Sequence, residues 1–463
     1  MSTIPLILLH GYHSSGDAFN TWRSILTNAG FNVQDIFVGN YVTENNEINV
    51  DDIAEGFDRA LRSRGMADKP FDVVVHSTGM LVLRSWLTAP LTKDRQKLVK
   101  HLIALAPATF GSPAATKGRS LLGRIFLGSH VLGPDFLNSG TLVLQNLELG
   151  SKFTWDLAHR DLFPPVGKSL YNNSPETPYV FIFDGTDDYG FIAEIFDKKD
   201  QLGTDGIVRW SGVSLDSRKI VLDFTNIPEN PDRFTWTDFT NLRMPMIPID
   251  GVHHNKILSV PPKGLQDLVV RALHVQSPAD VDAFYEIVDN DSIDVVKAGK
   301  AKLKKDPYQQ FVVHAIDDRG NGIDDFSIEV LARDARNQIT SIPAFEQFVH
   351  PYLPDTSYRC FHVRHNDIPF DKLNATGNKL LVRFRASSGT AIVRYQPFGG
   401  PGSTADFAEL DITSQAHNSD KKLFFPFTTT LIEVRLNREP VPLPRPPKVT
   451  FDNYEIFQFL EDR

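Results

Sequence analysis

A serine that could act as a nucleophile lies at position 77, inside the sequence VVVHSTGML (residues 73–81). The valines before it predict a buried strand, and the apolar residues after Gly79 predict a buried helix. A serine on a tight turn between a strand and a helix is held at the strand tip, where it can attack a carbonyl carbon. Because Val75 replaces the first glycine of the usual Gly-x-Ser-x-Gly pattern, an ordinary turn serine is the alternative. We predict that Ser77 is catalytic.

A serine nucleophile also needs hydrogen-bond donors for the oxyanion that forms on the attacked carbonyl group. One donor is the backbone N–H of the residue after the serine, here Thr78. The first apolar run, IPLILLHGY, ends in a His10-Gly11 turn that would direct the N–H of Tyr12 to the same place. We therefore predict an oxyanion hole formed by Tyr12 and Thr78. A plain strand-end turn is the alternative for residues 10–11.

Two loops could supply the carboxylate that orients a catalytic histidine. In LGTDGIVRWSG (residues 202–212), Asp205 lies between glycines ahead of a β-type run. In FDGTDDYG (residues 183–190), the three carboxylates of Asp184, Asp187 and Asp188 follow an apolar strand. These three could also be turn residues or a loose cation site. We predict Asp205, because lipase acid loops share its Asp-Gly-x-Val pattern and a carboxylate there can stabilise a cationic imidazole without taking its proton.

The base is predicted in DGVHHNKIL (residues 250–258), which contains His253 and His254. We choose His254, because apolar residues at the offsets of Ile257 and Leu258 are common after the base of a lipase. His253 remains the alternative base. The chain order serine, acid, histidine is the order expected for a nucleophile on a strand–helix turn.

The elements that must position these residues are short apolar strands alternating with helices. Strands are predicted at residues 4–11, 71–77, 101–107, 179–185 and 219–224, and helices at residues 51–64 and 79–87. This alternation predicts a mostly parallel sheet with helices on both faces, here of the α/β-hydrolase type. The pattern changes at residues 113–152, which are predicted to form a helical insertion near the site.

The sequence pattern changes again after residue 275. Runs in which apolar and polar residues alternate, separated by turn signals, predict a β-rich domain there. Residues 309–333 predict two strands around a Gly-Asn loop, and residues 379–398 predict a hairpin closed by Ser-Gly. The chain ends in a Pro-rich stretch and an aromatic tail. We therefore predict a catalytic domain at 1–275 and a β-rich domain at 276–463. The tail would engage lipid, support oligomers or strap this domain together.

Composition excludes several classes of protein. With a formal net charge of -9 over 463 residues, a broad nucleic-acid-binding surface is not expected. The single cysteine, Cys360, allows no intramolecular disulfide and no cysteine-based metal site. The first apolar run is too short for a signal peptide, and no later run could span a bilayer. We expect a soluble or peripherally membrane-bound protein that is otherwise cytoplasmic. We expect no metal and no cofactor, since serine catalysis needs none.

Three stretches together resemble the PlaB-type bacterial phospholipase A and lysophospholipase A family. They are VVHSTGMLVLRSWL, LAPATFGSPAATKGRSLLGR and LGTDGIVRWSGV, and the resemblance covers residues 1 to about 275. It implies hydrolysis of acyl esters of glycerophospholipids and lysophospholipids at a membrane surface through an acyl-enzyme. Ser77, Asp205 and one histidine of the pair at 253–254 would form the catalytic triad. The resemblance also implies self-association and a part for the C-terminal domain in lipid engagement.

The insertion contributes the predicted contacts with the substrate phosphate, Lys117, Arg119 and Arg124, which could instead be solvated helix charges. The same triad would serve a neutral lipase, a carboxylesterase or a thioesterase, so these classes of ester substrate are alternatives to phospholipids. A third interpretation is an interaction protein without catalysis on a hydrolase scaffold.

Overall fold

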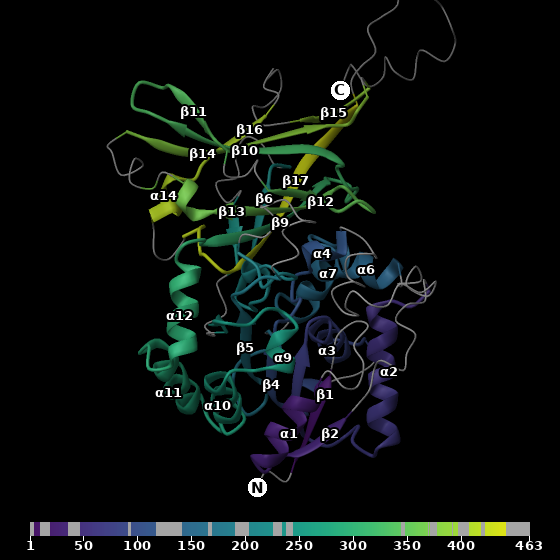
Figure 1. The fold of residues 1–463 in the computed structure, drawn as a ribbon. Coiled ribbons are helices and arrows are strands. Elements are labelled where there is room, and N and C mark those ends of the chain that lie inside the picture. The colour runs from purple at the N-terminus through teal and green to yellow at the C-terminus, as the bar shows by residue number, and fades with distance from the viewer. Residues whose placement is uncertain are drawn as a thin grey trace, which may run out of the picture.

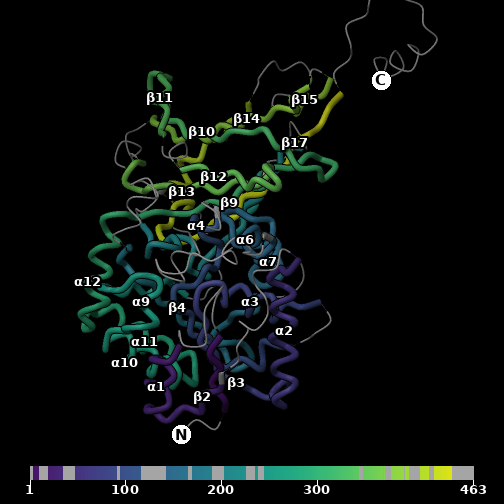
Figure 2. The backbone as a smooth tube through the Cα atoms, turned by 45° about the vertical axis from the view of Figure 1, so that its right-hand side comes forward, coloured from purple at the N-terminus to yellow at the C-terminus, as the bar shows by residue number. Residues whose placement is uncertain are grey.

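The protein consists of an α/β region at the N-terminal end and a β-rich region at the opposite end (Figures 1 and 2). The computed structural model describes residues 4–9, 19–35, 47–90, 94–116, 141–164, 169–189, 203–225, 234–237, 244–343, 348–368, 370, 377–390, 392–396, 407–417 and 422–440. None of the described helices has both the length and the apolar character needed to cross a bilayer.

The α/β region is built on a six-stranded sheet in which all neighbouring strands are parallel. Its order is β2 (Asn32–Asp35), β1 (Pro5–Leu9), β3 (Phe71–His76), β4 (Val99–Leu105), β5 (Tyr179–Gly185) and β8 (Met246–Ile249). Four predicted strands, β1, β3, β4 and β5, are confirmed. The two edge strands, β2 and β8, were not predicted, because each has only four residues and β8 contains a proline, which edge strands tolerate.

Helices cover both faces of this sheet, because successive residues of each strand point to opposite sides. Ile7 and Leu9 of β1 join one core, while Leu6 and Leu8 join the other. The first core is covered by α2 (Val50–Ser63), α3 (Gly79–Leu87), α4 (Pro113–Thr116), α6 (Thr141–Leu147) and α7 (Lys152–Asp161). The second is covered by α1 (Asn20–Asn28), α9 (Lys256–Ser259), α10 (Lys263–Ala272), α11 (Pro278–Asp289) and α12 (Asp294–Leu303). The predicted α/β class is confirmed.

The change between the two regions lies later in the chain than residue 275. Helices α11 and α12 follow that position, yet Phe284 and Val296 pack in the second core of the six-stranded sheet. Conversely, the strand predicted at residues 219–224 is not part of that sheet. This strand, β6 (Ser217–Asp223), pairs in parallel with β17 (Thr429–Pro440) of the β-rich region. Its apolar residue Ile220 packs in a third core that belongs to that region.

The β-rich region contains two sheets that share this third core. The larger sheet contains β6, β7 (Phe234–Trp236), β9 (Tyr308–Asp317), β12 (Val349–Pro351), β13 (Tyr358–Arg364), β15 (Val393–Gln396) and β17. The smaller sheet contains β10 (Asp325–Arg333), β11 (Ile339–Ile342), β14 (Lys379–Ser387) and β16 (Ala408–Asp411). Among the described residues, further elements are α14 (Thr413–His417) and the 3₁₀ helices at Arg95–Lys97, Trp210–Gly212 and His365–Asp367.

The hairpin predicted at residues 379–398 is wrong. Strand β14 is already paired on both edges, with β10 and with β16, so β15 pairs with β17 instead. The two strands predicted within residues 309–333 do form, as β9 and β10, but they belong to different sheets. Residues 441–463, which include the aromatic tail, lie outside the described residues.

Arg84 and Asp161 form an ion pair in which both side chains are fully buried. Nε of Arg84 donates to Oδ2 of Asp161 at 2.7 Å, and Nη2 donates to Oδ1 at 3.0 Å. The remaining nitrogen, Nη1, donates to the carbonyl oxygen of Thr109 at 2.6 Å. The hydroxyl group of Tyr171 also donates to Asp161, at 2.9 Å. Since Arg84 lies on α3, this network fixes the helix that follows Ser77 to α7.

Replacing Asp161 with alanine should lower the free energy of unfolding by about 3–5 kcal/mol, because the buried guanidinium of Arg84 loses its counter-charge. Denaturant unfolding followed by circular dichroism measures this loss. The matched control is Asp156→Ala on the same helix, which breaks an exposed pair with Lys152 (2.5 Å). That control should cost less than about 1 kcal/mol. Equal losses for the two variants would contradict the role of the buried pair.

Candidate active site

Ser77 lies on a strained turn between β3 and α3. Its φ angle is +55°, in the left-handed region that residues with a side chain rarely adopt. Backbone hydrogen bonds hold it there: its N–H donates to Leu105 at 3.3 Å, and its carbonyl oxygen accepts from Ala108 at 3.2 Å. Such strain costs about 1–3 kcal/mol and persists only where surrounding contacts impose it. A nucleophile on a strand–helix turn requires this conformation.

Asp205 and His254 are brought together in the interior, where both side chains are 0% exposed. Nδ1 of His254 donates to Oδ2 of Asp205 at 2.6 Å. The other oxygen of Asp205 accepts from the backbone N–H groups of Ile207 and Val208, each at 2.8 Å. Because Nδ1 carries the proton of this hydrogen bond, Nε2 is the nitrogen with the lone pair that a base needs.

The Asp205–His254 pair lies beside the turn that carries Ser77. Nε2 of His76, the residue before Ser77, donates to the carbonyl oxygen of His254 at 3.0 Å. The rings of His76 and His254 have their centroids 4.7 Å apart. Ser77, Asp205 and His254 follow β3, β5 and β8, so all three lie at the carboxyl edge of the parallel sheet.

His253 is placed differently from its neighbour. Its ring packs against Tyr189 at 4.0 Å between centroids, and Nδ1 accepts from the N–H of Lys256 at 3.4 Å. Burial lowers the pKa of His253. The side chain of Asp205 bonds with His254, so the geometry favours His254 as the base.

The competing carboxylates have other surroundings. Asp187 forms an ion pair with Lys302 on α12. Nζ of Lys302 also pairs with Oδ1 of Asp250 at 2.6 Å. Asp188 is exposed. Asp184 is buried next to Asp205.

Tyr189 joins the loop that carries Asp205 (the acid loop) to the loop that carries His254 (the base loop), a role that was not predicted from the sequence. Its hydroxyl oxygen accepts from the N–H of Asn255 at 3.1 Å, and its ring packs on His253. A Cβ atom at Gly206, where φ is +96°, would lie 2.6 Å from Cδ2 of Tyr189. The only sequence signal for this role was a tyrosine at the end of the alternative acid loop.

Gly185 is where strand β5 meets the base loop, and replacing it with alanine should impair activity. A Cβ atom there would lie 2.3 Å from the carbonyl oxygen of Val252 and 3.3 Å from Cα of His253. Relief of this overlap displaces the segment that carries His254. We expect kcat to fall at least about tenfold, with a loss of stability of about 1–3 kcal/mol. Initial rates and thermal unfolding measure the two effects.

The matched control for this variant is Gly65→Ala, far from the site. Its φ is +65° and a Cβ atom there would meet no atom within 4 Å. The control should lose stability through backbone strain and keep its kcat. A normal kcat for Gly185→Ala would contradict the position assigned to the base loop.

Several predicted site residues lie outside the described part of the chain. They are Tyr12 of the oxyanion hole and the three basic residues Lys117, Arg119 and Arg124. Thr78, the other predicted oxyanion donor, is the N-cap of α3. The N–H groups at the start of a helix have no partner within that helix, so an oxyanion can accept from Thr78. Among the described residues, no group of three His, Cys, Asp or Glu side chains could hold a metal ion.

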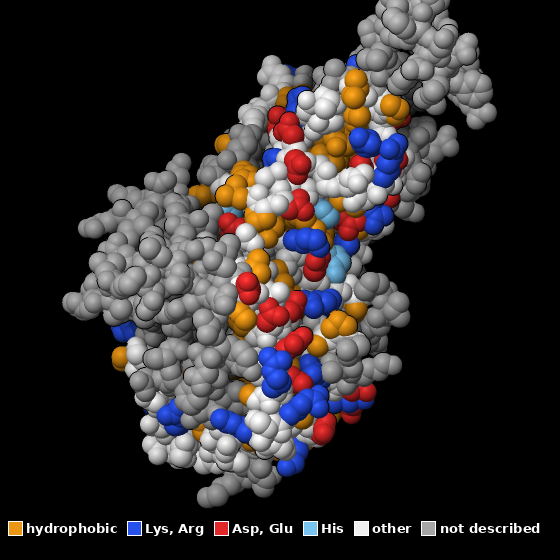
Figure 3. Space-filling model, turned by 90° about the vertical axis from the view of Figure 1, so that its right-hand side faces the viewer, with side chains coloured by type: hydrophobic (Ala, Val, Ile, Leu, Met, Phe, Trp, Pro, Cys, Tyr) orange, Lys and Arg blue, Asp and Glu red, His pale blue; other side chains and the backbone are white. Residues whose placement is uncertain are grey.

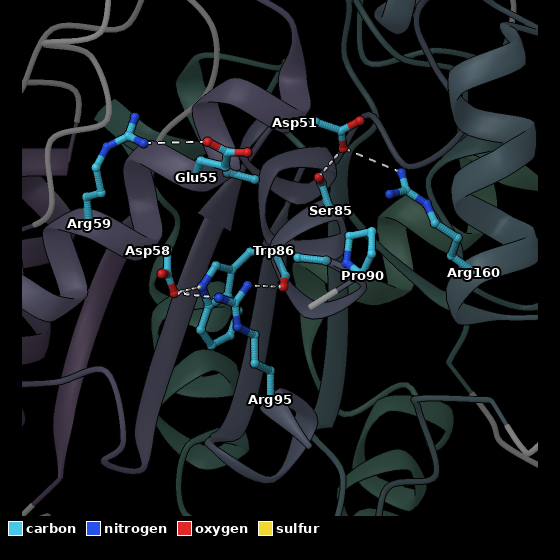
Figure 4. A pocket seen from close by; sticks show the side chains of 11 residues that line it. Asp51, Glu55, Asp58, Arg59, Ser85, Trp86, Pro90, Arg95 and Arg160 are labelled. Atoms are coloured by element: carbon cyan, nitrogen blue, oxygen red, sulfur yellow. Dashed lines mark hydrogen bonds and ion pairs between the residues drawn. The ribbon is translucent and has the colours of Figure 1, made fainter. Parts of the chain in front are cut away.

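A separate cavity of about 360 Å³ lies between α2, α3 and α7 (Figure 4). Its charged lining residues pair with one another, Asp58 with Arg95 at 2.6 Å, Glu55 with Arg59 at 3.5 Å and Asp51 with Arg160 at 3.5 Å. On the face of the molecule in Figure 3, acidic and basic side chains are likewise interspersed. The described residues of this face form no broad basic surface of the kind that binds nucleic acid.

Comparisons with known proteins agree with this architecture. A scan against protein-family models finds no match, and neither does a search of the curated proteins. Among solved structures, phospholipase PlaB from Legionella pneumophila matches with a TM-score of 0.73 at 21% identity. The match covers 97% of this chain and 98% of that chain. The fold is that of PlaB.

PlaB in complex with thio-NAD gives the same result, with a TM-score of 0.73, 20% identity and coverage of 97% and 98%. The lipase BlEst2 from Bacillus licheniformis matches at 18% identity over 55% of this chain and 86% of that chain, with a TM-score of 0.35. The likeness to PlaB confirms the predicted fold class, an α/β-hydrolase followed by a β-rich C-terminal region. At this level of identity the likeness to PlaB concerns the fold.

Proposed function

We propose that this protein is a serine hydrolase that cleaves carboxylic esters of lipids. The observation that carries the proposal is the buried hydrogen bond between Asp205 and His254, located beside the strained turn of Ser77. A nucleophile, a base and an orienting carboxylate at one edge of a parallel sheet are the groups that acyl transfer requires.

In the proposed mechanism, Nε2 of His254 accepts the proton of the Ser77 hydroxyl as its oxygen attacks the acyl carbonyl carbon. The N–H of Thr78, together with that of Tyr12, stabilises the oxyanion. The alcohol leaves with the proton from His254, and an acyl-enzyme remains on Ser77. Water, deprotonated by His254, then releases the fatty acid. Asp205 stays ionised throughout and stabilises the imidazolium.

The substrates we propose are glycerophospholipids and lysophospholipids. The His-Ser-Thr-Gly turn, the Asp205 loop and the fold shared with PlaB over nearly the whole chain support this choice. Lys117, Arg119 and Arg124 would contact the phosphate. The aromatic tail at residues 451–460 would help a peripheral, self-associating protein to engage a membrane surface.

Fatty-acid release from three substrates tests this proposal: phosphatidylglycerol vesicles, monoacylglycerol micelles and a short nitrophenyl ester. Faster release from phosphatidylglycerol than from the other two supports a phospholipase A. A preference for monoacylglycerol or for the short ester would indicate a lipase or a carboxylesterase with the same triad. Release from none of them would favour the interpretation as an interaction protein. Lys117→Glu and Arg124→Glu should reduce release from phosphatidylglycerol more than from monoacylglycerol, and equal losses would contradict the phosphate contacts.

A further inference from the structure

A second carboxyl group, that of Asp184, is buried next to the proposed catalytic acid. Asp184 is the penultimate residue of β5 and is 0% exposed. Side chains on one side of a strand recur every second residue, so Asp184 continues the stripe formed by Val180 and Ile182. Both of these apolar residues pack in the first core, together with Ile207 from the acid loop. A carboxyl group therefore occupies a position where the pattern calls for an aliphatic side chain.

Hydrogen-bond donors are distributed unequally between the two carboxyl groups. Asp205 accepts from two backbone N–H groups and from Nδ1 of His254. Asp184 accepts at Oδ1 from the N–H of Gly185 at 2.9 Å. Among the described residues, no N–H or O–H group donates to Oδ2 of Asp184, which is inaccessible to solvent. The negative charge is therefore stabilised on Asp205 and not on Asp184.

Two adjacent buried carboxyl groups do not both ionise, because neither water nor a cation balances the second charge. Burial, followed by the Asp205 carboxylate and a hydrogen bond between the two side chains, raises the pKa of Asp184 well above its ordinary value. A proton on Oδ2 changes this oxygen from an acceptor without a donor into a donor. The side chain with which Asp184 shares a hydrogen bond is that of Asp205.

We propose that Asp184 is a neutral positioning residue, which donates a hydrogen bond to the carboxylate of Asp205 and so holds it in line with His254. This inference rests on the function proposed above. The extra donor restricts rotation of the Asp205 carboxylate and stabilises its negative charge, so that the proton taken from Ser77 stays on the imidazole.

The other titratable groups around the pair come from the loops that follow β5 and β8. His254 forms a hydrogen bond with Asp205, and His253 interacts electrostatically with the charge of Asp205. The phenol of Tyr189 is buried nearby. Burial, followed by the Asp205 charge, raises the pKa of Tyr189, which keeps this phenol neutral. No lysine or arginine among the described residues contributes to the electrostatics of Asp184.

Two substitutions of Asp184 separate a neutral donor from an ionised carboxylate. Asp184→Asn keeps the shape and a donating N–H group, whereas Asp184→Leu keeps the approximate volume and removes the donor. With a short nitrophenyl ester, Asp184→Asn should retain kcat within about threefold, and Asp184→Leu should lose about tenfold or more. The acid limb of the kcat profile of the leucine variant should also move to higher pH, because a more basic Asp205 favours the protonated form of His254.

Either of two kinetic outcomes would overturn the proposal. If Asp184→Asn is as inactive as Asp205→Asn, then Asp184 acts as an ionised carboxylate. If Asp184→Leu folds and has the activity and the pH profile of the unaltered protein, then Asp184 positions nothing.

An infrared measurement tests the proton without relying on catalysis or on the leucine variant. The spectrum should contain the C=O stretching band of a protonated carboxylic acid, and Asp184→Asn should lack it. Recording at about pH 9 removes interference from Glu148, whose pKa burial raises to about 7. Absence of the band from the unaltered protein would overturn the proposal. If the band is present but no ester is hydrolysed, the proposed function fails while the proton on Asp184 stands.

Discussion

Replacing Ser77 with alanine is expected to lower kcat for ester hydrolysis by about 10⁶-fold, with residual turnover limited to what the oxyanion donors supply. The loss should be this large because alanine removes the hydroxyl group that attacks the ester in the proposed triad. Stability should change little, since alanine and serine meet similar strain at a φ angle of +55°. Single-turnover kinetics with a nitrophenyl ester, together with thermal unfolding, test both statements.

The matched control for Ser77→Ala is Ser85→Ala on α3. Ser85 is also buried, but its hydroxyl group donates to Asp51, away from the proposed site. The control should hydrolyse the ester at a normal rate. Retention of activity by Ser77→Ala would assign the nucleophile to another residue.

Asparagine in place of Asp205 should lower kcat by about 10⁴-fold, because an amide N–H facing Nδ1 of His254 favours the tautomer that carries its proton on Nε2. That imidazole has no lone pair directed at the nucleophile. The variant should fold, since its amide oxygen can still accept from the N–H groups of Ile207 and Val208. Measured values of kcat and circular dichroism spectra test the prediction.

Asp188→Asn is the corresponding control, because Asp188 is an exposed carboxylate of the alternative acid loop. Its kcat should stay normal. A loss for Asp188→Asn comparable with that for Asp205→Asn would show that the acid had been assigned to the wrong loop.

Local patterns were sufficient to predict strand β3 and helix α3, which form the turn at Ser77, and strand β5 of the same sheet. Strand β5 and helix α3 have the predicted bounds, because an apolar run and a helical period are properties of neighbouring residues. The pattern of β6 was equally clear, but a strand pattern carries no information about its partner. Pairing with β17, more than 200 residues later, places β6 in the other sheet. The same limitation accounts for the incorrect hairpin at residues 379–398.

Residue type and chain order were the properties of the sequence on which the proposed site was chosen. Asp205 and His254 were chosen on their loops, and the structure places their side chains 2.6 Å apart. The choice between two adjacent histidines depends on which ring faces the acid, and that orientation is set by packing against Tyr189. A proton on Asp184 depends on burial and on a neighbour 21 positions away, neither of which a local pattern contains.

Strand β6 lies between the acid loop and the base in sequence, but its hydrogen-bond partner β17 is near the C-terminal end of the described chain. The hydroxyl group of Thr429 at the start of β17 also donates to the carbonyl oxygen of Ser211, six residues after Asp205, at 2.9 Å. A fragment that ends at residue 275 would therefore lose the support behind its acid loop, and β6 would keep β7 as a partner but expose the edge that pairs with β17. The two halves should melt in one transition, and any shift of the C-terminal sheets would displace the carboxylate of Asp205.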